Sequence, residues 1–130
     1  MEDNERIVRE FWRLDNVRDF ASAASMMAST ATIDWVLTRE RIPSPQDWQA
    51  IKENYPGTWQ ITVKQVISEG TSCVTIADVK NDTHTETPIS FFTIEGERIT
   101  KPIEYWPQPQ QAAGWRDRWT VPLDDGEEAQ

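Results

Sequence analysis

The sequence predicts an α+β domain in which a few helices cover a curved antiparallel sheet and close off an apolar pocket. Three observations support this. Apolar residues recur at helical spacing early in the chain, they alternate with polar residues from Thr58 onward, and short turn signals separate the alternating segments. The length of 130 residues suits a single domain. We expect one domain over residues 1–123 and a disordered acidic tail over 124–130.

The first two helices are indicated by apolar residues three and four positions apart. Such a stripe runs through Ile7, Phe11 and Leu14 and predicts a helix over residues 4–15. A capping signal that ends at Asp19 predicts a second helix directly after it. The small residues of this second segment would let it pack closely on its neighbours.

One strand and a third helix follow. Residues 31–37 are rich in β-branched and aromatic side chains, which favours a strand. Ser44-Pro45-Gln46-Asp47 combines an N-cap serine with proline at the first helical position, a strong signal for a helix start. The Tyr55-Pro56-Gly57 run ends that helix.

The remainder of the regular structure reads as a meander of four antiparallel strands joined by short turns. Pro88 and Pro102 fall inside two of them and indicate strand edges or bulges. Beyond the sheet, we expect the segment with Trp115 and Trp119 to fold back onto the body. The four strands are expected to begin at about Thr58, Cys73, His84 and Arg98.

Composition excludes several classes of protein. The net charge of −9 disfavours nucleic acid and anionic membranes as partners, since both require clustered Lys and Arg. No run approaches the roughly 20 apolar residues of a membrane span, and the acidic N-terminus is not typical of a secretory signal. We therefore expect a cytoplasmic protein. Cys73 is the only cysteine, so an internal disulfide and a zinc site of several thiolates are excluded.

Three local strings carry a resemblance to a known family. They are residues 54–61 (NYPGTWQI), 89–94 (ISFFTI) and 98–107, the last containing EYWP and followed by Trp115-Arg116 and Trp119. The chain resembles the nuclear transport factor 2-like superfamily, specifically its SnoaL-like branch. The resemblance implies a cone in the order α-α-β-α-β-β-β-β, with the sheet wrapped around a long first helix. It also implies a pocket for a small hydrophobic ligand and a homodimer through the outer sheet face.

Strand parity combined with this resemblance predicts the pocket lining. Set against ketosteroid isomerase, the base position corresponds to Trp35, the tyrosine to Phe11 and the second acid to Ser90, so the sequence predicts no ketosteroid isomerase activity. A wall of aromatic residues would suit a flat, hydrophobic ligand. The predicted ligand-binding residues are Phe11, Trp35, Glu86, Ser90, Phe92 and Trp106.

Glu104 is the main candidate for catalysis. Its string resembles the last strand of limonene epoxide hydrolase and of some SnoaL-like cyclases, which carry an acid there. A carboxyl group in an apolar pocket prefers its neutral form, which raises its pKa and suits it to proton transfer. The alternative is a rim glutamate paired with Arg98 or Lys101.

Two further residues are secondary candidates for catalysis. Asp78 would form a carboxylate pair with Glu104 if its strand turned it inward. His84, the only histidine, could move protons, although its place beside a turn favours a solvated strand end. We expect no metal and no cofactor.

The sequence leaves two functions open. One is a cofactor-independent lyase, cyclase, isomerase or hydrolase that uses Glu104 as acid and base. The other is a non-catalytic module that binds a ligand or forms a homodimer.

Overall fold

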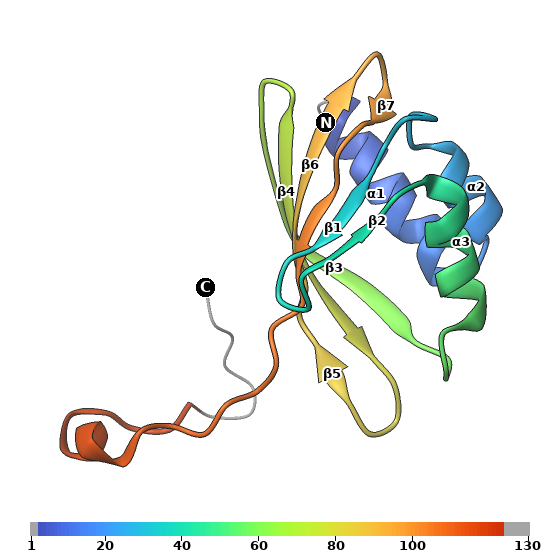
Figure 1. Cartoon of the computed structure of the whole chain (residues 1–130). Helices are drawn as coiled ribbons and strands as arrows, with labels where there is room; N and C mark the ends of the chain where they lie inside the picture. The colour runs from blue at the N-terminus through green and yellow to red at the C-terminus, as the bar shows by residue number, and fades with distance from the viewer. Residues whose placement is uncertain (1–2, 124–130) are drawn as a thin grey trace.

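The computed structural model describes residues 3–123, so the expected acidic tail at 124–130 lies outside the described residues. Helices pack against one face of a strongly bent sheet (Figure 1). The helices are α1 (Asp3–Asn16), α2 (Phe20–Ser25) and α3 (Pro45–Asn54), with a 3-10 helix η1 (Gly114–Trp119) near the C-terminal end.

The sheet is mixed, and its main strands lie in the order β2-β1-β8-β6-β4-β3. All pairs are antiparallel except β1 with β8. Two short strands lie off this path, where β5 pairs with β4 and β7 pairs with β6. The strands are β1 (Ile33–Trp35), β2 (Glu40–Ile42), β3 (Gln60–Glu69), β4 (Ser72–Lys80), β5 (Thr85–Glu86), β6 (Ile89–Glu95), β7 (Arg98–Ile99) and β8 (Ile103–Tyr105).

The predicted fold class is confirmed, and the differences lie in how the strands are divided. The segments expected as single strands from His84 and from Arg98 are each split in two, at Pro88 and at Pro102. Proline lacks the N–H that a sheet ladder needs, which explains both breaks. The short strand β2 was not predicted. A register shift between Val63 and Gln65 of β3 adds a bulge to the sheet.

Helix starts follow the predicted capping chemistry. The Ser44 hydroxyl accepts a hydrogen bond from the Asp47 backbone N–H at 3.1 Å, and Pro45 occupies the first helical position. The Asp19 carboxylate accepts from the Ser22 backbone N–H at 3.2 Å at the start of α2. These caps fix where α2 and α3 begin over the concave face of the sheet.

An aromatic core fills the space between α1 and the sheet. Phe11 contacts Trp12, Trp48 and Phe92, with ring centroids 5.4 to 6.1 Å apart. The buried Trp12 indole N–H donates to the Thr75 hydroxyl at 3.0 Å, so this large ring leaves no polar atom unpaired. The core occupies one end of the cone and leaves the other end open.

The C-terminal segment corrects one expectation. Past residue 110 the chain runs away from the body and carries η1 at its far end (Figure 1). Trp115 and Trp119 are 75% and 70% exposed, so the segment does not fold back onto its own domain. The prolines at 107 and 109 favour an extended backbone in which such a return is difficult.

Candidate functional site

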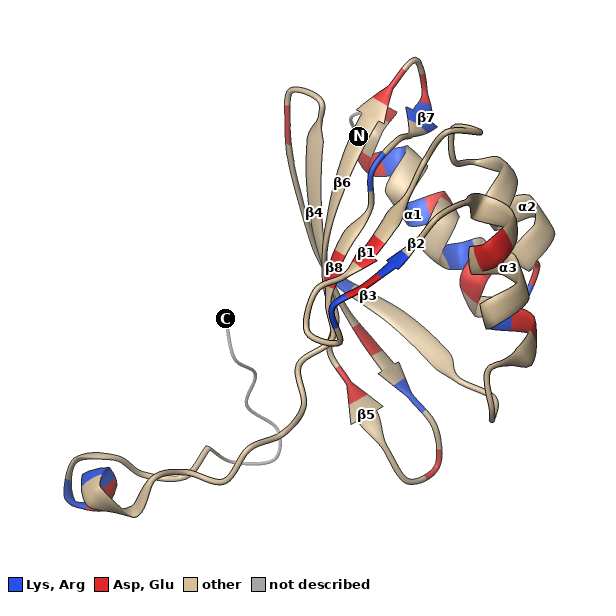
Figure 2. Ribbon diagram, viewed as in Figure 1, with Lys and Arg blue, Asp and Glu red and all other residues tan. Residues whose placement is uncertain are grey.

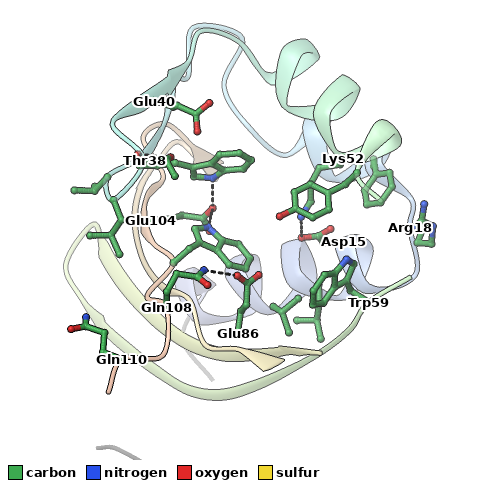
Figure 3. Close-up of a pocket in the computed structure, with 18 residues that line it drawn as sticks. Asp15, Arg18, Thr38, Glu40, Lys52, Trp59, Glu86, Glu104, Gln108 and Gln110 are labelled. Carbon is green, nitrogen blue, oxygen red and sulfur yellow. Dashed lines mark hydrogen bonds and ion pairs between the residues drawn. The ribbon is translucent and has the colours of Figure 1, made fainter. Parts of the chain in front are cut away.

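A cavity of about 450 Å³ opens at the end of the cone that the aromatic core leaves free. This volume is in the range of small-molecule sites in proteins. Aromatic side chains supply much of its wall, and charged groups stand among them (Figure 3). The aromatic lining residues are Phe20, Trp35, Tyr55, Trp59 and Trp106.

Glu104 lines this cavity and is only 5% exposed. Its Oε1 accepts from the indole N–H of Trp35 at 3.1 Å and of Trp106 at 3.4 Å. Its Oε2 accepts from the Ser90 hydroxyl at 2.7 Å. The surroundings of Glu104 are therefore more polar than the sequence suggested, because three side-chain donors point at one carboxyl group.

Sheet register explains why these donors meet. Glu104 pairs with Trp35 across the parallel β1–β8 ladder and with Ser90 across the antiparallel β6–β8 ladder. Residues directly opposite each other on paired strands share a face of the sheet. Trp106 lies two residues further along the chain and returns to the same side. Three donors, from β1, from β6 and from the residue directly after β8, thus converge at the Glu104 carboxyl group.

Asp15 is a second buried carboxyl at the cavity, and it comes from the end of α1. The Lys52 ammonium of α3 lies 3.3 Å from the Asp15 Oδ2, and the side chains of Asp15 and Lys52 are 4% and 17% exposed respectively. Burial raises the pKa of Asp15, the Lys52 ammonium opposes that rise, and the negative charge of Glu104 adds to it. Figure 3 places the Asp15–Lys52 pair and Glu104 on opposite walls.

The raised pKa of Asp15 predicts a distinctive pH dependence of stability. As pH rises above about 4, the unfolded chain loses its Asp15 proton first, so the folded state binds more protons and stability falls until the folded-state pKa is passed. Asp15→Asn lacks this titration. We therefore expect the stability of the wild type relative to Asp15→Asn to decrease as pH rises from 4 to 7.

Urea unfolding of both proteins between pH 4 and 8 measures this difference. Carboxylates whose pKa is lowered, such as Asp34 beside Arg41, titrate in both proteins and cancel in the comparison. A difference that stays constant with pH would contradict the expectation.

The structure brings four of the predicted site residues to the cavity wall: Trp35, Glu86, Glu104 and Trp106. Ser90 is fully buried and reaches the site only through its hydrogen bond to Glu104. Phe11 and Phe92 were expected in the lining, but they pack against each other in the aromatic core. The bent sheet places them too deep to reach the open end.

The two secondary catalytic candidates also lie elsewhere. Val79 lines the cavity, so the preceding residue Asp78 faces the outer side of β4. There its carboxylate accepts from the Thr87 hydroxyl at 3.0 Å and lies 3.5 Å from the Lys64 ammonium. His84 is exposed beside the β4–β5 turn and contacts the edge of Trp59. Neither forms a pair with Glu104.

Asp15 and Lys52 were missed in the sequence, although each carried a signal. Asp15 stands four residues after Phe11, so it extends the apolar stripe of α1 with an acid. Lys52 stands four residues after Trp48 and covers its ring, with the ammonium 5.6 Å from the ring centroid. A charged residue in line with an apolar stripe indicates burial when a partner of opposite charge is available.

Two classes of feature are not found in the described part of the chain. No three His, Cys, Asp or Glu side chains of residues 3–123 gather where they could hold a metal ion. No helix within the same range is long and apolar enough to cross a membrane.

Comparison of the whole structure with solved structures identifies the fold as nuclear transport factor 2-like. A protein from Kribbella flavida described as a candidate ketosteroid isomerase superposes with a TM-score of 0.89, at 19% identity over 97% of this chain and 93% of its own. The epoxide hydrolase/cyclase-like enzyme SalBIII gives a TM-score of 0.69, at 18% identity over 80% of this chain and 90% of its own.

A candidate SnoaL-like polyketide cyclase from Shewanella putrefaciens gives a TM-score of 0.70, at 7% identity over 82% of this chain and 90% of its own. No family model and no curated protein sequence matches the chain. At these identities the matches establish the fold alone and leave the activity open.

The Kribbella match also corrects one prediction. The exclusion of ketosteroid isomerases was wrong, because a structure so described superposes on nearly the whole chain. The exclusion rested on the residue types at three positions, Phe11, Trp35 and Ser90. It took no account of Asp15, which brings a second carboxyl group to the cavity beside that of Glu104.

Proposed function

We propose that the pocket is the active site of a cofactor-independent lyase, cyclase or isomerase that moves protons on a small, mainly apolar molecule. The observation that carries this is Glu104, a buried carboxyl group that lines an aromatic cavity. A carboxyl group has about four acceptor positions, and three are used by Trp35, Trp106 and Ser90. One lone pair remains to take a proton from a substrate, and the three donors fix where it points.

The opposite wall supplies the complementary group. When Glu104 removes a proton from a carbon next to a carbonyl, the electron pair moves to the carbonyl oxygen as an enolate. The Lys52 ammonium and the protonated form of Asp15 are hydrogen-bond donors for that oxygen. Glu104 then returns the same proton to a different carbon. The reaction needs no other reactant, since proton and electrons are conserved.

A small panel of substrates tests the proposal. It comprises a 3-oxo-Δ5 steroid, an epoxide with apolar substituents and a β-dicarbonyl compound whose acidic C–H exchanges with deuterium. We expect turnover above the buffer rate for at least one of them. The proposal fails if the folded protein accelerates none.

The charges around the cavity predict which ligands enter it. Four carboxyl groups and two basic groups line it, namely Asp15, Glu40, Glu86 and Glu104 with Arg18 and Lys52. This excess of acids repels an anion in a partly enclosed site. N-phenyl-1-naphthylamine is neutral, whereas 1-anilinonaphthalene-8-sulfonate has the same aromatic framework with a negative charge. We expect the neutral probe to bind about tenfold more tightly in fluorescence titrations, and equal affinities would contradict this.

The same hydrogen bonds also support a second function, in which their role is structural. Glu104 joins β1, β6 and β8 through its contacts with Trp35 and Ser90, so its role could be to hold the sheet together around a binding pocket. In that case the pocket binds a ligand without reaction. The substrate panel separates the two functions, because a purely binding pocket gives probe affinity without turnover.

A further inference from the structure

Glu104 is a buried carboxyl group that no basic side chain accompanies. It is 5% exposed, and its three donors, the indole N–H groups of Trp35 and Trp106 and the hydroxyl of Ser90, are all neutral. None of the ion pairs among residues 3–123 includes Glu104. Acids are almost never fully buried without a partner, because removing an unpaired ion from water is costly. The described part of the chain therefore supplies no positive charge for this carboxyl group.

Other acids of the domain do have a basic partner. Asp15, the second buried acid of the described residues, lies 3.3 Å from the Lys52 ammonium. Asp78 is more exposed, yet it lies 3.5 Å from the Lys64 ammonium on the outer face (Figure 2 shows the charged residues along the chain). Glu104 is the exception, and the cavity that it lines is the route by which a positive charge from outside can reach it.

The sheet side of the cavity adds further negative charge. Its acids are Glu40 of β2, Glu86 of β5 and Glu104 of β8, whereas the two bases that line the cavity, Arg18 and Lys52, come from the helical side. Figure 3 shows Glu40 and Glu104 on one side and Arg18 and Lys52 on the other. Like charges along one wall of a partly enclosed site create a potential that attracts the opposite charge. A ligand with one cationic end would therefore turn that end toward the sheet and away from Lys52.

Trp35 and Trp106 place aromatic rings beside the Glu104 carboxyl group. Both side chains line the cavity, and their N–H groups tie them to Glu104 at 3.1 and 3.4 Å. The face of an indole ring attracts a cation that lies within about 6 Å of its centre, more strongly than the ring of tyrosine or phenylalanine does. Calcium and magnesium ions instead require several oxygen ligands. A single buried carboxylate next to two indole rings therefore suits an organic ammonium ion.

We propose that the pocket binds small, mainly apolar molecules that carry an ammonium group, with the cation over the rings of Trp35 and Trp106. From there the cation compensates the charge of Glu104 and leaves its unused lone pair free. The apolar body of the ligand extends toward Asp15 and Lys52 on the helical side. This inference names the class of substrate for the proposed function, and it rests on that function only in taking this pocket as the ligand site.

Three ligands with one apolar framework measure the preference for a cation: 4-phenylbutylamine, 4-phenylbutan-1-ol and 4-phenylbutanoate. At pH 7 the amine is protonated, as a lysine side chain is. Titrations followed by nuclear magnetic resonance of the indole N–H groups give the dissociation constants and locate the ligand. We expect the amine to bind about tenfold more tightly than the alcohol, and the carboxylate to bind most weakly. The signals of Trp35 and Trp106 should shift, while those of the exposed Trp115 and Trp119 stay in place.

Glu104→Gln removes the charge and can keep the hydrogen bonds, so it should bring the amine and the alcohol to about equal affinity. Glu69→Gln is the matched control, because it changes the net charge equally at the exposed far end of β3 and should keep the preference. The comparison of the three ligands on the wild type holds independently of any variant.

The proposal is overturned if the wild type shows no saturable binding of the amine or binds the alcohol as tightly. A preference that survives in Glu104→Gln also overturns it, because the cation then does not depend on the buried carboxyl group. Binding is measured without turnover, so this inference and the proposed reaction can fail separately. Amine binding at Trp35 and Trp106 with no turnover of any panel substrate would support the ligand class and contradict the reaction.

Discussion

Replacing Glu104 by glutamine is expected to lower the rate of proton transfer by about 10²–10⁴-fold while preserving the fold. The amide is not a base, yet it can keep every contact of the carboxyl group. Its oxygen can accept from the indole N–H groups of Trp35 and Trp106, and its NH₂ can donate to Ser90, whose hydroxyl also serves as an acceptor. The expected stability change is therefore below about 1 kcal/mol.

The measurement is the turnover of whichever panel substrate the wild type accepts, with thermal unfolding recorded for each protein. Glu86→Gln is the matched control, because Glu86 also lines the cavity but accepts from Gln108 at 2.8 Å at its exposed side. We expect it to change the rate by less than about tenfold. Equal rates for the wild type and Glu104→Gln would show that Glu104 takes no part in the reaction and would favour the binding function.

Replacing Lys52 by methionine is expected to destabilise the domain by about 3 kcal/mol at pH 7. The substitution keeps the apolar stem over Trp48 and removes the charge that compensates buried Asp15. Asp15 can escape by taking up a proton. Protonating a carboxyl group whose unfolded-state pKa is about 3.9 costs about 4 kcal/mol at pH 7, so the loss of stability cannot exceed that value. The loss should shrink as pH falls toward 4.

The double variant Asp15→Asn/Lys52→Met is the control for this prediction. It removes both charges, so it should recover most of the stability that the single variant loses, because a neutral pair carries no desolvation cost. Urea unfolding at pH 5 and pH 7 provides the comparison. A loss in Lys52→Met that is the same at both pH values would show that the buried charge is not its cause.

The two carboxyl groups differ in how far the sequence predicted them. Glu104 was found because alternation along the strand put it on one face with Trp106, and the family resemblance implied that this face points inward. Asp15 was not found, because its burial requires α3 to bring Lys52 against the end of α1. That is a contact between residues 37 positions apart, and the local signal for burial at each position does not say that the two residues pair.

The errors in the predicted lining have the same origin. Phe11 and Phe92 do face inward, as the periodicity indicated. The concave side of the sheet, however, has one end filled by the aromatic core and one end open as the cavity, and both residues lie at the filled end. Asp78 was left undecided until the ladder of β3 with β4 and the buried neighbours of Asp78 placed it on the outer face. The depth of a side chain along a bent sheet depends on curvature, which arises from the bulge in β3 and the proline breaks together.

The sequence alone determined the fold class, the helix starts at Asp19 and Ser44, and the inward direction of Glu104, because each depends on residues close together in the chain. Only the tertiary structure decided that Asp15 and Lys52 face Glu104 across one cavity, and that the C-terminal segment with Trp115 and Trp119 extends away from the body. The first arrangement depends on how distant segments pack, and the free energy that selects it comes from contacts that do not exist until the whole sheet has closed around α1. In the second, the Trp115 and Trp119 side chains stay 75% and 70% exposed.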